Sequence, residues 1–377
     1  MTAPMTAARR FEPGIQAGLF LLFLALPALD AVFDLDPTKR PPNQARVSAP
    51  AAPQDASDLK GWRDGYESYL DDSFGWRSWA VRSFNRLNYR LFRVSERRNV
   101  VVGRDDWLYF GSAAVEYHRA TAPFSNAELR RRGQSIERRR QWLAKQGVQY
   151  LFAIAPNKHS IYPEHLPSKY LRTGPVSRYE QLAEYLENET GVTVVDLHSP
   201  LLVAKQKEQV YERSGSHWNS RGAHIAYRAI HDQLSQWFPV LDQPVAWETI
   251  ELAKRGPGEL VRMQGLEGMI DEQLSRPIGG LHHTRLKFKG KGRLVTERDD
   301  VSLPRALIFH DSFIIAEAPF LAEHFSHATF EWRSAFDGEL VQQLKPDVVI
   351  EQRVERNLLL PAFRSILPPA VAEEGTE

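Results

Sequence analysis

The chain contains no cysteine among its 377 residues. Disulfides, thiolate metal sites and a cysteine nucleophile are therefore excluded. The charge is nearly balanced, because 48 Lys and Arg stand against 47 Asp and Glu, for a formal net charge of +1. No excess of positive charge points to nucleic acid, so we expect no nucleic-acid partner.

Cofactor signatures are also missing. The sequence has no Gly-rich phosphate loop and no dinucleotide fingerprint. His159 with His165, and the pair His282-His283, do not have a spacing typical of a metal site. We therefore expect neither a cofactor nor a metal. With 42% hydrophobic residues, the chain is long enough for one large α/β domain with an appendage.

One charge-free apolar run, Ile15–Leu29, lies near the N-terminus. Arg9 and Arg10 precede it, and it is followed by Asp30, Asp34 and Asp36. This order of charges predicts that the N-terminus stays inside and the rest of the chain is translocated. At about 15 to 19 residues the run is short for a spanning helix. We favour an inner-membrane anchor as its interpretation. The alternatives are a cleaved signal peptide, which would leave a periplasmic protein, and a buried core helix.

Composition divides the chain into four segments. Residues 1–33 form the predicted membrane segment, and the Pro- and Ala-rich residues 34–57 predict an extended tether. Residues 58–360 form the predicted α/β domain, and 361–377 a tail. Within the domain, residues 239–303 break the strand–helix rhythm and predict a β-rich or looped insertion.

The first part of the domain predicts helices and a hairpin. Recurring aromatic residues over 59–92 indicate amphipathic helices that are broken near Gly75. Residues 100–110 predict a β-hairpin. A helix should follow from about 125 to 146. Its arginines at 130–132 and 138–140 are interpreted as a solvated face, with an acidic-polymer surface as the alternative.

Strands and helices then alternate. Apolar runs predict strands at 150–155, 192–197, 305–309 and 347–350, and a helix is expected over 220–238. This alternation predicts a parallel sheet with helices on both faces. In such a sheet, functional loops lie at the carboxyl ends of the strands.

Ser312 is the candidate nucleophile, because it follows the strand 305–309 on the turn into the next element. A serine hydroxyl needs a base, and His217 is the best candidate. Its segment Gly-Ser-His-Trp-Asn, residues 215–219, leads into a helix. We expect Asp311 to brace the turn rather than to react. The N–H of Ser312 and a group from another loop would stabilise an oxyanion.

A second loop, residues 156–163, leaves the first core strand at the same end of the predicted sheet. Lys158 and Tyr162 lie in this loop. They either contact substrate or pack against the loop itself.

Several motifs occur in an order that carries a resemblance to a known family. Between Leu59 and Arg356 they are Phe74-Gly75-Trp76-Arg77, Val101-Val102-Gly103, Trp107-Leu108-Tyr109, Pro156-Asn157-Lys158, Ile161-Tyr162-Pro163, Tyr211, His217-Trp218-Asn219, Arg221-Gly222, Asp311-Ser312-Phe313, Lys345-Pro346-Asp347 and Glu355-Arg356. In this order they resemble the AlgX/AlgJ-type SGNH-hydrolase-like family of alginate O-acetyltransferases.

The resemblance implies an SGNH-like domain with a permuted motif order, in which His217 precedes Ser312. It also implies a periplasmic protein, anchored or secreted. A membrane-bound O-acyltransferase would supply acetyl, and the hydroxyls of an exopolysaccharide would accept it from an acetyl-serine. Tyr211 and Asn219 match family motifs and are candidates for supporting roles.

One position departs from the family pattern. Where the family has Asp-x-His, this chain has Gly215. Either another carboxylate orients His217, with Glu212 near in sequence, or a Ser–His dyad suffices, or activity is lost. We hypothesise a slow dyad, in which Gly215→Asp would raise kcat. His310 is also unusual, because a small residue normally precedes the Asp-Ser pair, so it either crowds the turn or supplements the site.

Three functions therefore remain open from the sequence. The first is an envelope-anchored polysaccharide O-acetyltransferase. The second is a catalytically degenerate glycan-binding or scaffold component of a polysaccharide synthesis and export complex, which Gly215 motivates. The third is a carbohydrate esterase, because water can resolve the same acyl-enzyme.

Overall fold

The protein is described here by a computed structural model. It describes residues 11–33, 47–53, 55, 57–73, 77–241, 243–279, 281, 287–288, 292–361 and 365–368. The predicted break near Gly75, the pair His282-His283, and most of the tether and the tail lie outside these residues. The chain divides into two compact units, residues 1–92 and 93–377.

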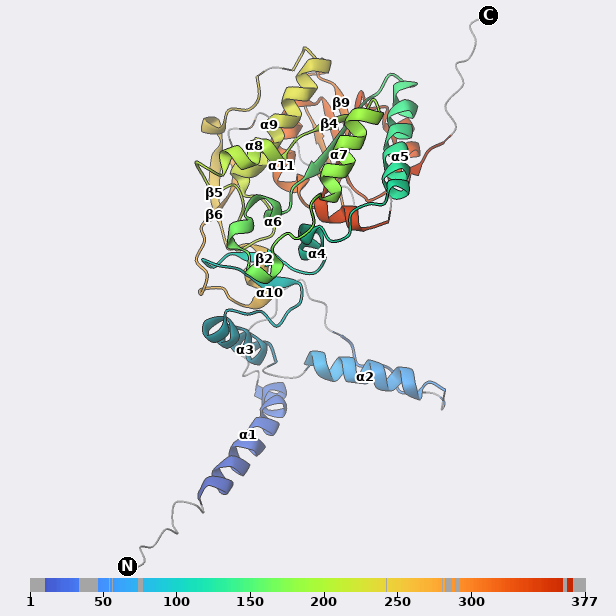
Figure 1. The fold of residues 1–377 in the computed structure, drawn as a ribbon. Coiled ribbons are helices and arrows are strands. Elements are labelled where there is room, and N and C mark those ends of the chain that lie inside the picture. The colour runs from blue at the N-terminus through green and yellow to red at the C-terminus, as the bar shows by residue number, and fades with distance from the viewer. Residues whose placement is uncertain are drawn as a thin grey trace, which may run out of the picture. The chain divides into compact units, whose positions relative to one another are not determined.

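The first unit is helical (Figure 1). It contains α1 (Phe11–Phe33), α2 (Leu59–Ser73) and α3 (Arg77–Phe92). The last two are the amphipathic helices that the aromatic spacing predicted, and α1 includes the apolar run. Within the described residues, no helix combines the length and apolarity needed to cross a bilayer.

The second unit is built on a seven-stranded sheet with the order β4-β3-β12-β9-β10-β8-β7. Its strands are β3 (Gln149–Ala155), β4 (Thr193–Val195), β7 (Lys287–Phe288), β8 (Arg293–Glu297), β9 (Arg305–His310), β10 (His327–Trp332) and β12 (Val348–Val354). The five strands from β4 to β10 are parallel, as predicted.

The sheet is not wholly parallel, and that part of the prediction is wrong. Strands β8 and β7 are antiparallel additions beside β10. Both strands come from the predicted insertion. A parallel pair of strands needs a crossover connection, usually a helix, and the insertion has none between these strands, so they add to the sheet in the antiparallel direction. The insertion is β-rich, as expected, because it also contains the antiparallel pair β5 (Glu251–Arg255) and β6 (Leu274–Gly279).

Helices cover both faces of the sheet (Figure 1). One face packs against α5 (Asn126–Ala144), α7 (Arg178–Glu189) and α12 (Gly338–Leu344), and the other against α8 (His198–Ala204), α9 (Ser220–Trp237) and α11 (Ile314–Leu321). Strand β9 shows the alternation that this requires. Leu307 and Phe309 pack on the face covered by α5, α7 and α12. Ala306 and Ile308 pack on the opposite face.

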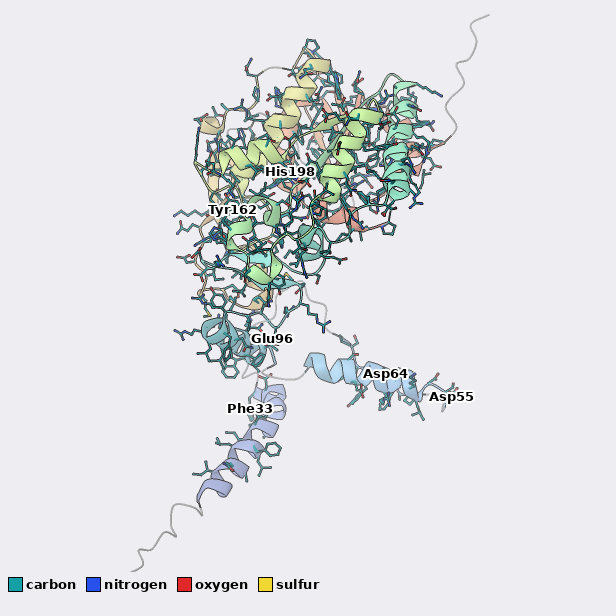
Figure 2. All side chains as sticks on the ribbon, viewed as in Figure 1. Phe33, Asp55, Asp64, Glu96, Tyr162 and His198 are labelled. Atoms are coloured by element: carbon teal, nitrogen blue, oxygen red, sulfur yellow. The ribbon has the colours of Figure 1, made fainter. Side chains whose placement is uncertain are left out.

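Shorter elements complete the unit. They are β1 (Val100–Val102) and β2 (Leu108–Phe110), which form the predicted hairpin, α4 (Ala113–Arg119), α6 (Lys158–Ile161), α10 (Glu259–Gln264), β11 (Phe336–Asp337), β13 (Ser365–Ile366) and the 3-10 turns at 163–165, 168–170, 247–249, 322–324 and 355–359. Figure 2 shows the side chains of this unit, among them Tyr162 and His198.

Two arginines of α5 correct the solvated-face interpretation. Arg139 is fully buried, and its Nη1 donates to both carboxylate oxygens of Glu351 at 2.8 and 2.6 Å. Arg132 is also buried and pairs with Glu128 at 3.1 Å. Both lie on the α5 face that carries Ile136 toward the sheet. Their guanidinium groups are buried because carboxylates within reach compensate the charge.

Candidate active site

His217 lies on a short hairpin, residues 209–219, which we call the histidine hairpin. Tyr211 pairs with Trp218 in an antiparallel bridge. The Glu212 N–H donates to the His217 carbonyl at 3.1 Å. The hairpin leads into α9, where Asn219 caps the helix by accepting from the Gly222 N–H at 2.9 Å. Asn219 therefore caps the N-terminus of α9, the helix that follows His217 in the chain.

Ser312 lies in the turn between β9 and α11. Its Oγ is 2.8 Å from His217 Nε2, so the structure brings the two candidate catalytic residues into a hydrogen bond although 95 residues separate them. Phe313 locks the turn to the hairpin: its ring contacts the Trp218 ring at 4.8 Å, and its carbonyl accepts from Trp218 Nε1 at 3.1 Å.

Asp311 braces the turn, as expected. One carboxylate oxygen accepts from the Phe313 N–H at 3.1 Å. The other accepts from the Val354 N–H at 2.7 Å and from Asn357 Nδ2 at 3.0 Å. These bonds connect the serine turn to the end of the neighbouring strand β12, and none of them involves His217.

His310 supports the same turn and does not crowd it. Its imidazole is buried, and Nδ1 donates to the Asp311 carbonyl at 2.7 Å. Burial lowers the pKa of His310, which keeps the ring neutral. The ring packs edge-on against Phe330 and Trp332 of β10. It therefore packs toward β10 and does not hydrogen-bond to Ser312.

A carboxylate from the insertion reaches His217. Glu259, the first residue of α10, places Oε1 3.3 Å from His217 Nδ1. The same oxygen accepts from the Ser216 N–H at 2.8 Å and from its hydroxyl at 2.5 Å. The carboxylate that the sequence motif lacks is thus supplied from elsewhere in the chain. Sequence reasoning missed Glu259, because nothing in its local pattern connects it to His217.

The electrostatics fit this assignment. Burial alone would raise the pKa of the Glu259 carboxyl, but the hydrogen bond and charge of His217, together with the bonds from Ser216, hold that pKa well below its usual range. Glu259 therefore stays ionised at neutral pH. An ionised carboxylate at Nδ1 fixes the imidazole tautomer and favours the imidazolium that forms when Nε2 takes a proton.

Two carboxylates occupy the space beside Gly215. A Cβ added there would lie 2.8 Å from Oε2 of Glu259 and closer still to Oε2 of Glu212. Glu212 is buried and ion-paired with Arg255. Burial, opposed by Arg255, raises the pKa of Glu212 to about 7. The two glutamates occupy the volume that a residue-215 side chain would need.

Lys158 hydrogen-bonds to the backbone at the tip of the histidine hairpin. It is 1% exposed, and Nζ donates to the carbonyls of Glu212 at 2.8 Å and Arg213 at 3.2 Å, and also to that of Gly215. Burial lowers its pKa to about 7, against the attraction of nearby glutamates. Of the two alternatives given for Lys158, the structure favours the structural one, because the side chain begins just after the end of β3 and its ammonium group hydrogen-bonds to the hairpin backbone.

Tyr162 and Tyr211 have the same structural character. The Tyr162 hydroxyl accepts from the Val210 N–H at 3.0 Å. The Tyr211 hydroxyl donates to the Pro156 carbonyl at 2.6 Å. Both rings are buried. Tyr162 is therefore also not open to substrate, and the two tyrosines tie the hairpin to the loop after β3.

Two further polar residues lie next to the serine turn. Arg356 stacks over the Phe313 ring at 5.4 Å, and its Nη1 donates to Asn157 Oδ1 at 3.0 Å. Asn157 is buried at the end of β3, and its Nδ2 has no hydrogen-bond partner among the described residues. A buried donor without a protein partner is unfavourable unless ordered water or a ligand accepts from it. Sequence reasoning quoted Asn157 and Arg356 only as family motifs.

The comparisons with known proteins agree with this architecture. Residues 100–278 match the sequence model of a family described as "SGNH hydrolase-like domain, acetyltransferase AlgX". The matched range includes His217 and Glu259, while Ser312 lies beyond it. The resemblance inferred from the motifs is thereby confirmed. The fold is an SGNH-hydrolase-like α/β fold.

Similar curated proteins are named "Probable alginate O-acetylase AlgJ". The one from Pseudomonas syringae pv. tomato is 29% identical over 218 residues, which are 57% of this chain and 54% of that protein. The one from Azotobacter vinelandii is 27% identical over 304 residues, 79% of this chain and 72% of that protein. The chain spans about half the length of the Pseudomonas syringae and Pseudomonas fluorescens relatives.

A solved structure shares the fold. Bacillus cereus PatB1, solved with a sulfonyl adduct, superposes with a TM-score of 0.51 at 18% sequence identity. The similarity covers 69% of this chain and 97% of that one. At this identity the likeness supports the fold only.

We predict that Glu259→Gln leaves the fold intact and lowers kcat for acetyl-ester cleavage, by up to about 10⁴-fold. That is the loss when the triad aspartate of a serine protease becomes an amide, which favours the wrong imidazole tautomer. Release of p-nitrophenol from p-nitrophenyl acetate measures it. Glu251→Gln, an exposed acid on the same insertion, is the control and should stay within about twofold of the parent. Retention of more than half the activity in Glu259→Gln would remove Glu259 from the mechanism.

The pH dependence of stability checks the same pair. Because the folded pKa of Glu259 is lowered, its stabilising contribution is complete above the unfolded value of about 4.3 and is lost as the pH falls through the folded value. The difference in unfolding free energy between parent and Glu259→Gln should therefore be constant near neutral pH and shrink below about pH 4.3. Urea melts across this range measure the difference.

We further predict that Gly215→Asp lowers kcat, the reverse of what the sequence motif suggests. The new side chain would overlap two carboxylates, and overpacking of this kind costs about 1–3 kcal/mol before charge repulsion is added. Thermal melts and ester turnover measure both effects. Gly256→Asp is the matched control, because no atom lies within 4 Å of its added Cβ. A stable Gly215→Asp protein that turns over faster than the parent would restore the dyad hypothesis.

Proposed function

We propose that the protein is an O-acetyltransferase that moves acetyl groups onto hydroxyls of a polysaccharide through an acetyl-Ser312 intermediate. The observation that carries the proposal is the chain of contacts from Ser312 Oγ through His217 to Glu259, at 2.8 and 3.3 Å. The confirmed resemblance to acetyltransferase AlgX supports the choice of acetyl transfer over other serine chemistry.

In the first half-reaction, Ser312 Oγ attacks the acetyl carbonyl carbon of the donor. His217 Nε2 takes the Oγ proton as the new C–O bond forms. Glu259 accepts the Nδ1–H and stabilises the imidazolium. The tetrahedral oxyanion would be held by the Ser312 N–H, with Asn157 Nδ2 as the second donor. When the intermediate collapses, the leaving group takes the proton from His217 and Ser312 remains acetylated.

In the second half-reaction, a sugar hydroxyl replaces the leaving group. His217, again neutral, removes the hydroxyl proton as the sugar oxygen attacks the acetyl carbon. The bond to Ser312 Oγ then breaks, and Nε2 returns the proton to the serine. If water attacks instead of sugar, the same site is an esterase. The identity of the acceptor therefore decides between transferase and esterase.

The setting of the reaction belongs to the same proposal. The similar proteins named alginate O-acetylase motivate an exopolysaccharide acceptor of the alginate type. A membrane-bound O-acyltransferase would supply acetyl at the inner membrane. Arg9 and Arg10 before the apolar run motivate export of the residues that follow it, with the chain anchored or released into the periplasm.

A catalytically degenerate scaffold is the second candidate. Its motivation was the absence of a carboxylate at position 215. Because Glu259 contacts His217, that absence no longer argues for lost activity. The scaffold proposal would regain support only if the acyl-enzyme cannot form.

We predict that Ser312 becomes acetylated. Incubation with p-nitrophenyl acetate and rapid acid quenching should add one acetyl group to the peptide that contains Ser312, as measured by mass spectrometry. Ser312→Ala should carry no label there, whereas Ser302→Ala, an exposed serine before β9, should be labelled like the parent. Equal labelling of Ser312→Ala would refute the serine mechanism. If added glycan accelerates the release of the acetyl label, the protein is a transferase. If added glycan leaves the rate of release unchanged, the protein is an esterase.

We predict export of the second unit. A C-terminal alkaline-phosphatase fusion should be active in cells, because that enzyme folds only outside the cytoplasm. Replacing Arg9 and Arg10 with Glu should lower its activity by weakening the retained positive flank. An inactive phosphatase fusion beside an active cytoplasmic reporter fusion would contradict the proposed topology.

A further inference from the structure

Two adjacent residues in the turn after β12 hold Asn157, which follows β3 in the chain. The Glu355 carboxylate accepts from the Asn157 backbone N–H at 2.7 Å. The Arg356 guanidinium donates through Nη1 to Asn157 Oδ1 at 3.0 Å. Because β3 and β12 are parallel neighbours in the sheet, their carboxyl ends lie side by side. The two contacts therefore fix both the backbone and the side chain of Asn157 relative to the sheet.

The contact with Arg356 determines which way the Asn157 amide points. A guanidinium group offers only donors, so the amide atom that faces it must be the carbonyl oxygen. The opposite orientation would place two donors against each other. Nδ2 is therefore directed away from Arg356, and it is buried without a hydrogen-bond partner among the described residues.

Arg356 lies against the turn that carries the nucleophile. Its guanidinium carbon is 5.4 Å from the centroid of the Phe313 ring, and Phe313 directly follows Ser312. The same carbon is 5.2 Å from the centroid of a second ring, that of Phe110. Cation–π contacts of this kind hold the planar group in place. Arg356 therefore connects Asn157 to the serine turn.

The charge of Arg356 is not used in an ion pair among the residues that the structure describes. Arg353, three residues earlier on β12, pairs with Glu351 at 3.4 Å. Burial lowers the pKa of the Arg356 guanidinium, and the charges of Asp311 and Glu259 oppose this shift, although neither carboxylate is bonded to it. The hydrogen bond of Arg356 goes to a neutral amide instead.

A charged donor on Oδ1 strengthens the other end of the amide. Hydrogen bonds from an ionised group are stronger than neutral ones, and inside a protein they polarise the group that accepts them. Electron density drawn toward the carbonyl oxygen makes the Nδ2–H groups better donors. Donors that are fixed before the reaction stabilise an oxyanion without having to reorganise.

We propose that Arg356 is a positioning residue for the oxyanion: it orients and polarises the Asn157 amide so that Nδ2 donates to the acetyl carbonyl oxygen as Ser312 attacks. The proposal rests on the proposed function, because this oxyanion exists only if Ser312 is acylated. Arg356 acts through Asn157 and touches no reacting atom. Neither side chain loses a proton, because both only donate hydrogen bonds while the charge on the oxygen forms and then disappears.

A double-mutant cycle tests this dependence. Arg356→Met retains an apolar side chain against the two phenylalanine rings but removes the donors, and Asn157→Ala removes the amide. For cleavage of p-nitrophenyl acetate, we expect Asn157→Ala to lower kcat by about 10²–10³-fold, the usual effect of losing one oxyanion donor. Arg356→Met should lower kcat by about tenfold or more and change KM little, because the contact acts in the transition state. The double variant should be no slower than Asn157→Ala, because no amide remains to be positioned.

Chemical rescue separates positioning from a general effect on folding. In Arg356→Ala, which leaves room for a guanidinium ion, millimolar guanidinium chloride should restore part of the lost kcat. It should restore none when Asn157→Ala is added. Arg356→Lys retains a donor for Oδ1 and should be faster than Arg356→Met. Arg140→Ala is the matched control, because Arg140 is a partly exposed arginine that pairs with Glu137 on α5. It should equal the parent with and without guanidinium, and thermal melts should show every variant folded.

Ser312→Ala separates failure of this proposal from failure of the proposed function. If Ser312→Ala cleaves the ester like the parent, the acyl-serine is rejected and the positioning role falls with it. If Ser312→Ala is inactive but Arg356→Met cleaves like the parent, the acyl-serine stands and the positioning role alone is rejected. The same holds if the losses from Arg356→Met and Asn157→Ala multiply in the double variant, or if neither guanidinium nor Arg356→Lys restores activity.

Discussion

The geometry of the site depends on one buried ammonium group. Lys158 donates to three backbone carbonyls of the histidine hairpin, those of Glu212, Arg213 and Gly215. The lysine supplies these carbonyls with a donor inside the protein, and the Arg213 carbonyl also accepts from the Leu108 N–H at 2.9 Å. His217 lies two residues after Gly215 on the same hairpin, so the position of the hairpin tip affects that of the imidazole. Lys158 thereby helps to set the position of the imidazole, although no contact with Ser312 is found for it among the described residues.

The carboxylate partner of His217 illustrates how a triad can keep its geometry while its residues change place. In the Asp-x-His pattern, the acid and the base lie on one segment. Here Gly215 removes the side chain from that segment, and Glu259 enters the same volume from α10. Gly215 and Glu259 are thus complementary, because a Cβ at position 215 would lie 2.8 Å from Glu259 Oε2. Ser216 stabilises the arrangement, because its N–H and hydroxyl both donate to the carboxylate of Glu259.

The parts of this structure that the sequence predicts are those that rest on local patterns. The end of strand β9 placed Ser312, and the motif that begins α9 placed His217. Glu259 could not be predicted, because it lies 43 residues beyond Ser216 in a segment with no strand–helix rhythm. Arg139 was assigned to solvent because the sequence does not show its partner. Glu351 follows 212 residues later, on a strand that packs against α5. Long-range charge pairs decide both cases.

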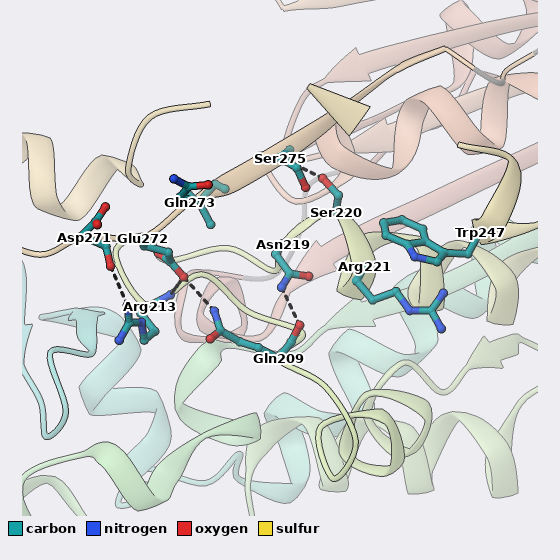
Figure 3. A pocket seen from close by; sticks show the side chains of 11 residues that line it. Gln209, Arg213, Asn219, Ser220, Arg221, Trp247, Asp271, Glu272, Gln273 and Ser275 are labelled. Atoms are coloured by element: carbon teal, nitrogen blue, oxygen red, sulfur yellow. Dashed lines mark hydrogen bonds between the residues drawn. The ribbon is translucent and has the colours of Figure 1, made fainter. Parts of the chain in front are cut away.

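The insertion contributes to the same site at two points. It supplies Glu259, which contacts the base, and it supplies Glu272, which hydrogen-bonds to the tip of the histidine hairpin. The Glu272 carboxylate accepts from Gln209 Nε2 (Figure 3) and from the backbone N–H groups of Arg213 and Ser214. A displacement of Glu272 would therefore move the backbone three to four residues before His217. The orientation of His217 thus depends on two separate parts of the insertion, and the insertion belongs to the site.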